Sequence, residues 1–171
     1  MMTPILALVM PVIIGVSARI DPRRSNIDKS WPLLRWVSMC TVAFMLAVHA
    51  FSLNAMLNEG QSLNSGLVMA LVGVLYIAIG NVLPKFKSNF MGGVRTPWAL
   101  SSETNWYKTQ RVSGWSMMVA GILVIPLALL VPTGSAVWVA MPLLVLAPLV
   151  GVVYSFLLYQ KEQAQEHEQS V

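Results

Sequence analysis

His49 is the one ionisable side chain well inside a long apolar run of this 171-residue sequence. An ionisable group within a membrane-spanning segment is by default a candidate for proton transfer or ligand binding. A proton relay would need a second titratable group nearby, and the apolar runs contain no Asp, Glu, Lys or Arg. We therefore expect a neutral imidazole that is hydrogen-bonded to a neighbouring carbonyl.

The sequence contains no recognisable set of catalytic or metal-ligating residues. Its single cysteine, Cys40, cannot form an intrachain disulfide, and with only His49 and His167 it offers too few ligands for a zinc site. Neither an H-E-x-x-H nor a G-x-S-x-G pattern occurs, and no two carboxylates lie close together within an apolar run. We therefore expect no enzymatic activity, no metal and no cofactor.

The composition predicts an all-α, polytopic membrane protein. Hydrophobic residues make up 56% of the chain and charged residues only 11%, against about 25% charged residues in soluble domains. The runs without charge are 1–18, 36–58, 60–84 and 112–160. A helix needs about 20 apolar residues to cross a bilayer, so the first three runs fit one crossing each and the fourth fits two.

We expect a single membrane domain over residues 1–171, a bundle of five transmembrane helices with a structured cytoplasmic loop. The expected spans are 2–18, 36–57, 63–83, 113–131 and 136–158. The expected cytoplasmic segments are the loops 19–35 and 84–112 and the tail 159–171. The first span is expected to be retained rather than removed as a signal peptide, because no basic residue precedes its apolar stretch.

The distribution of Lys and Arg predicts the orientation in the membrane. All eleven lie in the two expected loops and the tail, whereas the turns near 58–64 and 131–135 hold only Glu59 as a charge. The positive-inside rule then places the loops and the carboxyl terminus in the cytoplasm and the amino terminus outside.

Small residues recur at helical spacing in three of the expected spans, a pattern typical of closely packed membrane helices. In the third span they are Gly66, Ala70, Gly73 and Gly80, on one face with Ile77. The fifth has Ala147, Gly151 and Ser155, and the second has Ala43, Ala47, Ala50 and Asn54. We expect these faces to be the helix contacts.

The connection 84–113 is far longer than the two to eight residues that usually join neighbouring helices, so we expect it to have structure or function. Pro84 is expected to end the third helix, and Gly92-Gly93 permits a reversal of the backbone. Thr96-Pro97 forces an extended step.

A new helix is expected to begin after Ser101 or Ser102 and to continue as the fourth span. Either serine can cap this helix, and Glu103 lies in its first turn, where the helix dipole favours an acidic side chain. Aromatic and basic residues alternate through the connection, as in collars that bind anionic lipid headgroups. They are Phe86, Phe90, Trp98, Trp106 and Tyr107 among Lys85, Lys87, Arg95, Lys108 and Arg111.

The stretch Gly93-Val94-Arg95-Thr96-Pro97-Trp98-Ala99-Leu100, followed by Ser102-Glu103, Trp106 and Arg111, resembles the signature of the SdpI family of bacterial membrane proteins. Gly80-Asn81, Pro84-Lys85 and Asn89 also resemble the family's approach to this motif. The similarity is close over about residues 75–115.

The resemblance implies an all-helical protein of the bacterial plasma membrane without enzymatic activity. In the family's best-understood role, such a protein confers immunity to a secreted, sporulation-delaying peptide toxin. When engaged, it also holds a cytoplasmic transcriptional repressor at the membrane. Typical members have six spans, and the absence of an amino-terminal span would account for the odd number expected here.

The resemblance also implies roles for individual residues of this sequence. The candidate partner-binding residues are Arg95, Thr96, Pro97, Trp98, Glu103, Trp106 and Arg111. The candidate loop-supporting residues are Asn81, Asn89 and Gly93. Glu103 is expected to pair with Arg95 or Arg111, and the alternative that these residues merely fix the fold of the loop stays open.

We therefore expect an SdpI-like immunity or signalling protein that binds a peptide toxin or a cytoplasmic regulator without catalysis and does not contact nucleic acid. A small membrane transporter is one alternative, because Pro126, Pro142 and Pro148 would kink their helices. It is disfavoured because the spans lack charged groups for a charged substrate. A protein that binds lipid headgroups is the other alternative.

Overall fold

The computed structural model describes residues 9, 11–16, 19–58, 64–132 and 134–169, and within these ranges all regular structure is helical. The elements are α2 (Arg24–Leu57), α3 (Ser65–Val82), the 3-10 helix η1 (Leu83–Lys85), α4 (Pro97–Ser101), α5 (Glu103–Leu130) and α6 (Ala136–Gln169). The prediction of an all-helical protein is confirmed. Within the described ranges, four helices are long and apolar enough to cross a membrane: α2, α3, α5 and α6. Most of the expected first span, 2–18, lies outside the described residues.

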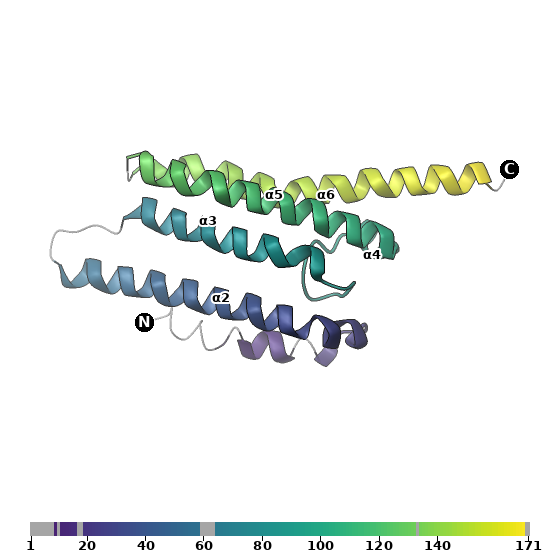
Figure 1. Ribbon diagram of the computed structural model, residues 1–171, viewed down its shortest axis with the longest axis horizontal. Helices are drawn as coiled ribbons and strands as arrows, with labels where there is room; N and C mark the ends of the chain where they lie inside the picture. The colour runs from purple at the N-terminus through teal and green to yellow at the C-terminus, as the bar shows by residue number, and fades with distance from the viewer. Residues whose placement is uncertain (1–8, 10, 17–18, 59–63, 133, 170–171) are drawn as a thin grey trace.

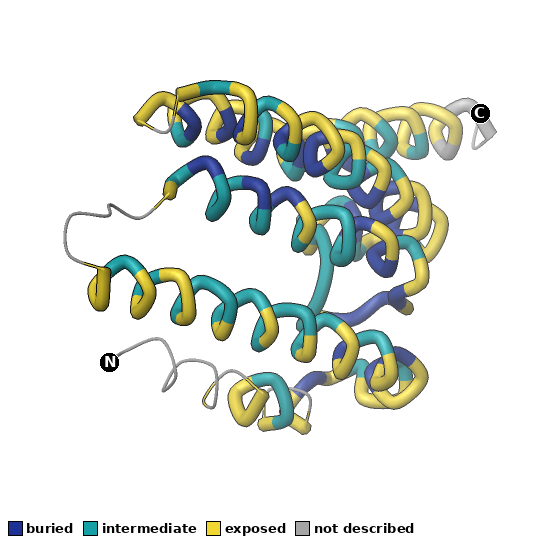
Figure 2. Tube along the Cα trace, turned by 60° about the vertical axis from the view of Figure 1, so that its left-hand side comes forward, coloured by how far each residue is buried: buried dark blue, intermediate teal, exposed yellow. Residues whose placement is uncertain are grey.

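The helices lie side by side along the long axis of the molecule (Figure 1). Helix α5 packs against both α3 and α6, whereas α2 contacts mainly α3. Buried positions concentrate between α3, α5 and α6 and around the connection that precedes α4, while most of α2 is half-buried or exposed (Figure 2). One apolar cluster therefore joins α5 and α6, and another lies beneath the α3–α4 connection.

Helices α3 and α5 approach closely through small residues that repeat every seven positions. Gly66, Gly73 and Gly80 on α3 face Ala128, Gly121 and Gly114 on α5 in antiparallel order. A Cβ atom added to Gly80 would lie only 2.6 Å from the carbonyl oxygen of Gly114, and one added to Gly114 would lie 2.6 Å from that of Gly80. The hydrophobic effect does not drive helices together inside a bilayer, so close van der Waals contact of this kind is what stabilises the α3–α5 pair.

The sequence also predicts a face of small residues on α6 and one on α2, and the two differ in burial. On α6, Ala147, Gly151 and Ser155 are all buried, as expected. On α2, Ala43, Ala50 and Asn54 are exposed and Ala47 is half-buried, so no close helix contact along this face is seen among the described residues. The buried residues of α2 are Ile27, Ser30 and Leu34, because this helix packs against the rest through its first turns.

Replacing Gly80 by Ala should destabilise the α3–α5 pair. The added methyl group has no room beside the Gly114 carbonyl, and overpacking of this kind costs about 1–3 kcal/mol. Gly134→Ala is the matched control, because no atom lies within 4 Å of its added Cβ. Thermal unfolding of the detergent-solubilised protein should show a lower midpoint for Gly80→Ala only. Equal midpoints for the two variants would contradict the observed packing.

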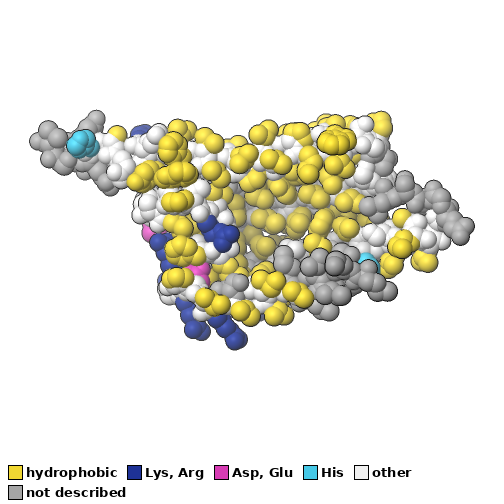
Figure 3. Space-filling view, turned by 180° about the vertical axis from the view of Figure 1, so that it is seen from behind, with side chains coloured by type: hydrophobic (Ala, Val, Ile, Leu, Met, Phe, Trp, Pro, Cys, Tyr) yellow, Lys and Arg dark blue, Asp and Glu magenta, His cyan; other side chains and the backbone are white. Residues whose placement is uncertain are grey.

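The helices extend beyond the apolar runs at the end of the molecule where the charges gather (Figure 3). The segment 19–35, expected as a loop, is helical from Arg24 onward, and α5 begins at Glu103, ten residues before the expected span. The expected tail is helical to Gln169. A charged residue shows where a helix leaves the hydrocarbon core, but the helix itself can continue into water. The apolar runs therefore underestimate the lengths of these helices.

Candidate functional site

Asn89 organises the first half of the connection between η1 and α4. Its side chain is only 1% exposed. Its Oδ1 atom accepts hydrogen bonds from the backbone N–H groups of Met91 (2.8 Å) and Gly92 (2.7 Å), and its Nδ2 atom donates to the Lys87 carbonyl (2.6 Å). One buried side chain thus satisfies three backbone groups that have no helix or strand partner.

Gln110 of α5 holds the second half of the connection. Its Nε2 atom donates to the Val94 carbonyl (2.9 Å), and its Oε1 atom accepts from the Val94 N–H group (3.0 Å). The Gln110 side chain is fully buried. The Gln110 amide lies so close to the backbone of residue 93 that only glycine, which has no Cβ atom, fits there. Gly93 has a φ of +93°. The predicted reversal at Gly92-Gly93 is therefore present, with the left-handed conformation at Gly93.

Trp106 lies beneath the connection and not on its surface. Its side chain is 2% exposed, and its Nε1–H group donates to the Phe86 carbonyl (2.9 Å). Phe86, Ala99 and Trp106 belong to one buried apolar cluster with residues of α2 and α3. In this structure the motif tryptophan supports the loop.

Thr96 ties the start of α4 to α6. Its Oγ1 atom accepts from the Ala99 N–H group (3.1 Å) and caps α4. It also lies 2.8 Å from Ser155 Oγ, which itself donates to the Val152 carbonyl, so the Thr96 hydroxyl is the donor in this pair. Trp98 adds an edge-to-face contact with Phe156 at 4.9 Å between ring centroids.

A chain of buried polar groups continues between α5 and α6. Asn105 Nδ2 donates to the Ser155 carbonyl (3.2 Å), and its Oδ1 atom accepts from Thr109 (3.0 Å). The predicted cap at Ser102 is confirmed, since its Oγ atom accepts from the Asn105 N–H group (2.9 Å) and Glu103 lies in the first turn. Ser102 also donates to Glu162 of α6 (3.2 Å).

The segment before α2 docks on the same connection, which the sequence did not indicate. Asp21 is buried and accepts from the Phe90 N–H group (2.8 Å). Arg23 donates to Ser88 Oγ and to the Leu100 carbonyl and lies over the Phe90 ring. These partners are 65 to 77 residues away in sequence, so no local pattern could reveal them.

Two polar residues in the first turns of α2 complete this contact. Asn26 donates to the Ser88 carbonyl (2.8 Å), and Ser30 accepts from the Lys87 N–H group (3.2 Å). In the described part of the chain, every buried side-chain nitrogen and oxygen atom has a hydrogen-bond partner. Such complete satisfaction is what holds a loop in one conformation, because each lost partner leaves a buried polar group unpaired.

The remaining sequence-predicted site residues lie on the surface. Arg95, Pro97, Glu103 and Arg111 are exposed, and so is Asn81 on the last turn of α3. Among the described residues no ion pair joins Arg95, Glu103 and Arg111, and Arg95 donates instead to the Phe90 carbonyl. Glu103 and Arg111 are eight residues apart on one helix, about 12 Å along its axis, which is too far for an ion pair.

Tyr107, which the sequence places only in the aromatic and basic collar, is 54% exposed and lies one turn after Glu103 and one turn before Arg111. Arg95, Pro97, Glu103, Tyr107 and Arg111 are called the loop surface below. Two of these residues are cations, one is an anion and one is an aromatic ring. Arg95 lies in the connection and Pro97 begins α4, whereas Glu103, Tyr107 and Arg111 follow one another at four-residue spacing along one face of α5. Such a surface can bind a partner through ion pairs, hydrogen bonds and stacking.

The histidine, cysteine and acidic side chains of the described residues do not gather into one cluster. No group of three or more His, Cys, Asp or Glu side chains in these ranges could hold a metal ion. His49 is half-buried on α2 and makes no hydrogen bond within the described part of the chain, so the expected bond to a neighbouring carbonyl is not seen there.

Comparison with known proteins places the loop inside a recognised family segment. Residues 85–155 match the model of the SdpI/YfhL protein family. Immunity protein SdpI of Bacillus subtilis (strain 168) is 32% identical over 108 residues, which are 62% of this chain and 51% of that protein. The chain thus matches about half the length of this relative. No solved structure is significantly similar.

Proposed function

Because this chain belongs, through residues 85–155, to the SdpI/YfhL protein family, we propose that it is a membrane protein of the immunity type that acts by binding. The matched segment begins at the end of η1 and includes the connection, α4, α5 and the first half of α6. The observation that supports the proposal is the rigid connection. Its buried polar side-chain atoms all have hydrogen-bond partners, while the residues of the loop surface are exposed. The partner is a peptide toxin or a cytoplasmic regulator.

The composition of the loop surface favours a protein partner. A preformed surface loses little conformational entropy on binding, which raises its affinity for a partner. Glu103 adds an exposed carboxylate, which would repel an anionic headgroup, whereas a protein can supply a matching cation. The lipid collar considered from sequence is therefore the weaker account of these residues.

Replacement of the relative tests this function directly. We expect the chain, expressed in B. subtilis strain 168 in place of Immunity protein SdpI, to restore survival in mixed culture with the unmodified strain. Membrane levels are matched by immunoblot. The control cells contain neither this chain nor Immunity protein SdpI. If the chain reaches the membrane at the level of Immunity protein SdpI and survival does not rise above that of the control cells, the immunity proposal is wrong.

The loop surface is proposed to face the cytoplasm, because the Lys and Arg residues gather at its end of the bundle. In a Cys40→Ala background, we expect single cysteines at Ser25 and Thr104 to be shielded from an impermeant thiol reagent in intact cells. A cysteine at Ser135 should be labelled. All three positions are exposed, so shielding reports sidedness rather than burial. Labelling of the Thr104 variant without permeabilisation would reverse the orientation.

A further inference from the structure

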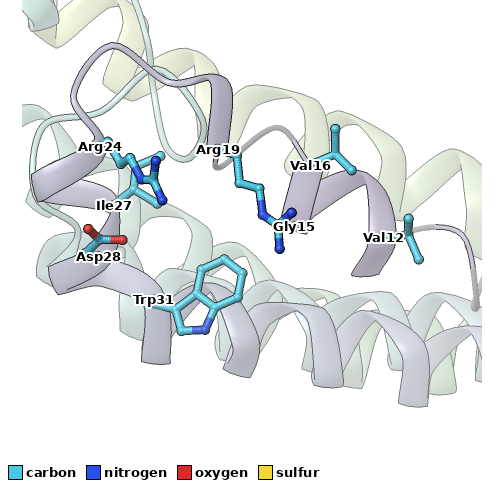
Figure 4. A pocket seen from close by; sticks show the side chains of 8 residues that line it. All are labelled: Val12, Gly15, Val16, Arg19, Arg24, Ile27, Asp28 and Trp31. Atoms are coloured by element: carbon cyan, nitrogen blue, oxygen red, sulfur yellow. The ribbon is translucent and has the colours of Figure 1, made fainter.

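A cleft of about 500 Å³ lies between the first turns of α2 and the preceding residues 12–16 and 19, and it shares no residue with the loop surface. Arg19 and Arg24 contribute its basic groups, Asp28 its one carboxylate, and Trp31, Val12 and Val16 much of its apolar wall. Figure 4 shows the Arg19 and Arg24 side chains entering the same cleft, with the Trp31 ring beside them.

The side chains of Arg19 and Arg24 are available to bind a ligand. Both are exposed, and within the described ranges neither makes a hydrogen bond or an ion pair. Arg23, between them, is by contrast engaged by Ser88 and Leu100. Two free guanidinium groups that enter one cleft are suited to a phosphate, which they bind through paired N–H donors. Asp28 leaves the cleft with one net positive charge.

A second, apolar cleft continues from the first along α2. Its volume is about 620 Å³, it shares Trp31 with the basic cleft, and it extends past Arg35 and Met39 to Leu46, with Pro11 and Ile14 on the opposite wall. Fifteen residues of helix separate Trp31 from Leu46, which is about 22 Å. That distance exceeds the roughly 15 Å of one leaflet of the hydrocarbon core, so a whole acyl chain fits along it.

We propose that one anionic glycerophospholipid occupies the two clefts, with its phosphate held by Arg19 and Arg24 and one acyl chain along α2 from Trp31 to Leu46. A basic end that continues into an apolar groove matches the two ends of such a lipid. Tryptophan at the junction is typical of the membrane–water interface. A headgroup with hydroxyl groups, as in phosphatidylglycerol, neutralises the cleft and can donate a hydrogen bond to Asp28.

Native mass spectrometry of the detergent-solubilised chain, titrated with dioleoylphosphatidylglycerol, tests the basic end. We expect a one-lipid adduct whose affinity falls at least ~10-fold in Arg19→Gln/Arg24→Gln. Lys108→Gln/Lys161→Gln is the matched control, since it removes two exposed cations outside both clefts. An equal loss in the control, or unchanged binding in the arginine variant, would overturn the proposal.

The acyl groove is tested with Ala43→Phe, which fills part of the apolar cleft. This variant should bind dioleoylphosphatidylglycerol more weakly and dihexanoylphosphatidylglycerol with unchanged affinity. Inorganic phosphate should not displace the long-chain lipid at equal concentration, and dioleoylphosphatidylcholine should bind at least ~10-fold more weakly. Displacement by phosphate would identify a free-anion site, and equal binding of phosphatidylcholine would exclude selection for anionic lipid; either result contradicts the proposal.

Discussion

Cells that express Arg95→Ala should survive mixed culture no better than cells without this chain, although the variant inserts and folds normally. Arg95 is exposed, lies outside every helix, and makes one hydrogen bond, to the Phe90 carbonyl. Its removal therefore costs the fold little and deprives the loop surface of the cation nearest the reversal at Gly93. The measurement pairs survival with the detergent-extracted yield and the size-exclusion profile of each variant.

Two further substitutions sharpen this expectation. Arg95→Lys should be partly defective, because an ammonium group cannot reproduce the planar, bidentate pairing of a guanidinium group. Lys87→Ala should protect fully, since it removes an exposed cation from the same connection outside the loop surface. Trp98→Ala is less informative, because it also removes the contact with Phe156 of α6.

Glu103→Ala decides between partner binding and a lipid collar. It should lose protection if a protein partner pairs with this carboxylate, and it should retain protection if the segment binds only headgroups. Full protection by Arg95→Ala, Trp98→Ala and Glu103→Ala at normal yield would move the binding surface to other faces of the helices or to the opposite side of the membrane.

Gly93→Ala should unfold the connection and abolish protection. A non-glycine residue at a φ of +93° costs about 1–2 kcal/mol, and the added Cβ would displace the Gln110 amide. The two hydrogen bonds of that amide to Val94 contribute about 0.5–1.5 kcal/mol each, so the expected total is about 3 kcal/mol. Thermal unfolding and survival should both report the loss.

Gly92→Ala is the matched control for this prediction. Gly92 does not have a positive φ, and the nearest atom to its added Cβ is a Phe86 ring carbon at 3.5 Å, an ordinary contact. The control should therefore resemble the wild type in both measurements. If the two glycine variants behave alike, the Gln110 contact does not determine the conformation of the connection.

Features of the fold that depend on local chemistry could be predicted from the sequence. The cap at Ser102 and the acidic first turn follow from the preferences of a helix start. The reversal at Gly92-Gly93 follows from the conformations open to glycine. The small face of α3 follows from helical spacing, because residues three and four apart share a face.

Features that depend on residues distant in sequence could not be predicted. Asp21 meets the Phe90 N–H group only because α2 and the connection lie at the same end of the bundle. Asn105 and Gln110 are ordinary polar residues of a helix until the chain folds over them and buries both. The expected pairing of Arg95 with Glu103 is absent because the Phe90 carbonyl offers Arg95 a nearer partner.

Amide hydrogen exchange in the wild-type connection tests the central claim, that buried side chains hold this segment in one conformation. Asn89 accepts from the N–H groups of Met91 and Gly92, and Gln110 accepts from that of Val94. We predict that these three amides exchange at least ~100-fold more slowly than those of an unstructured peptide. Exchange at the unstructured rate would show that the connection is not preformed and would contradict the account.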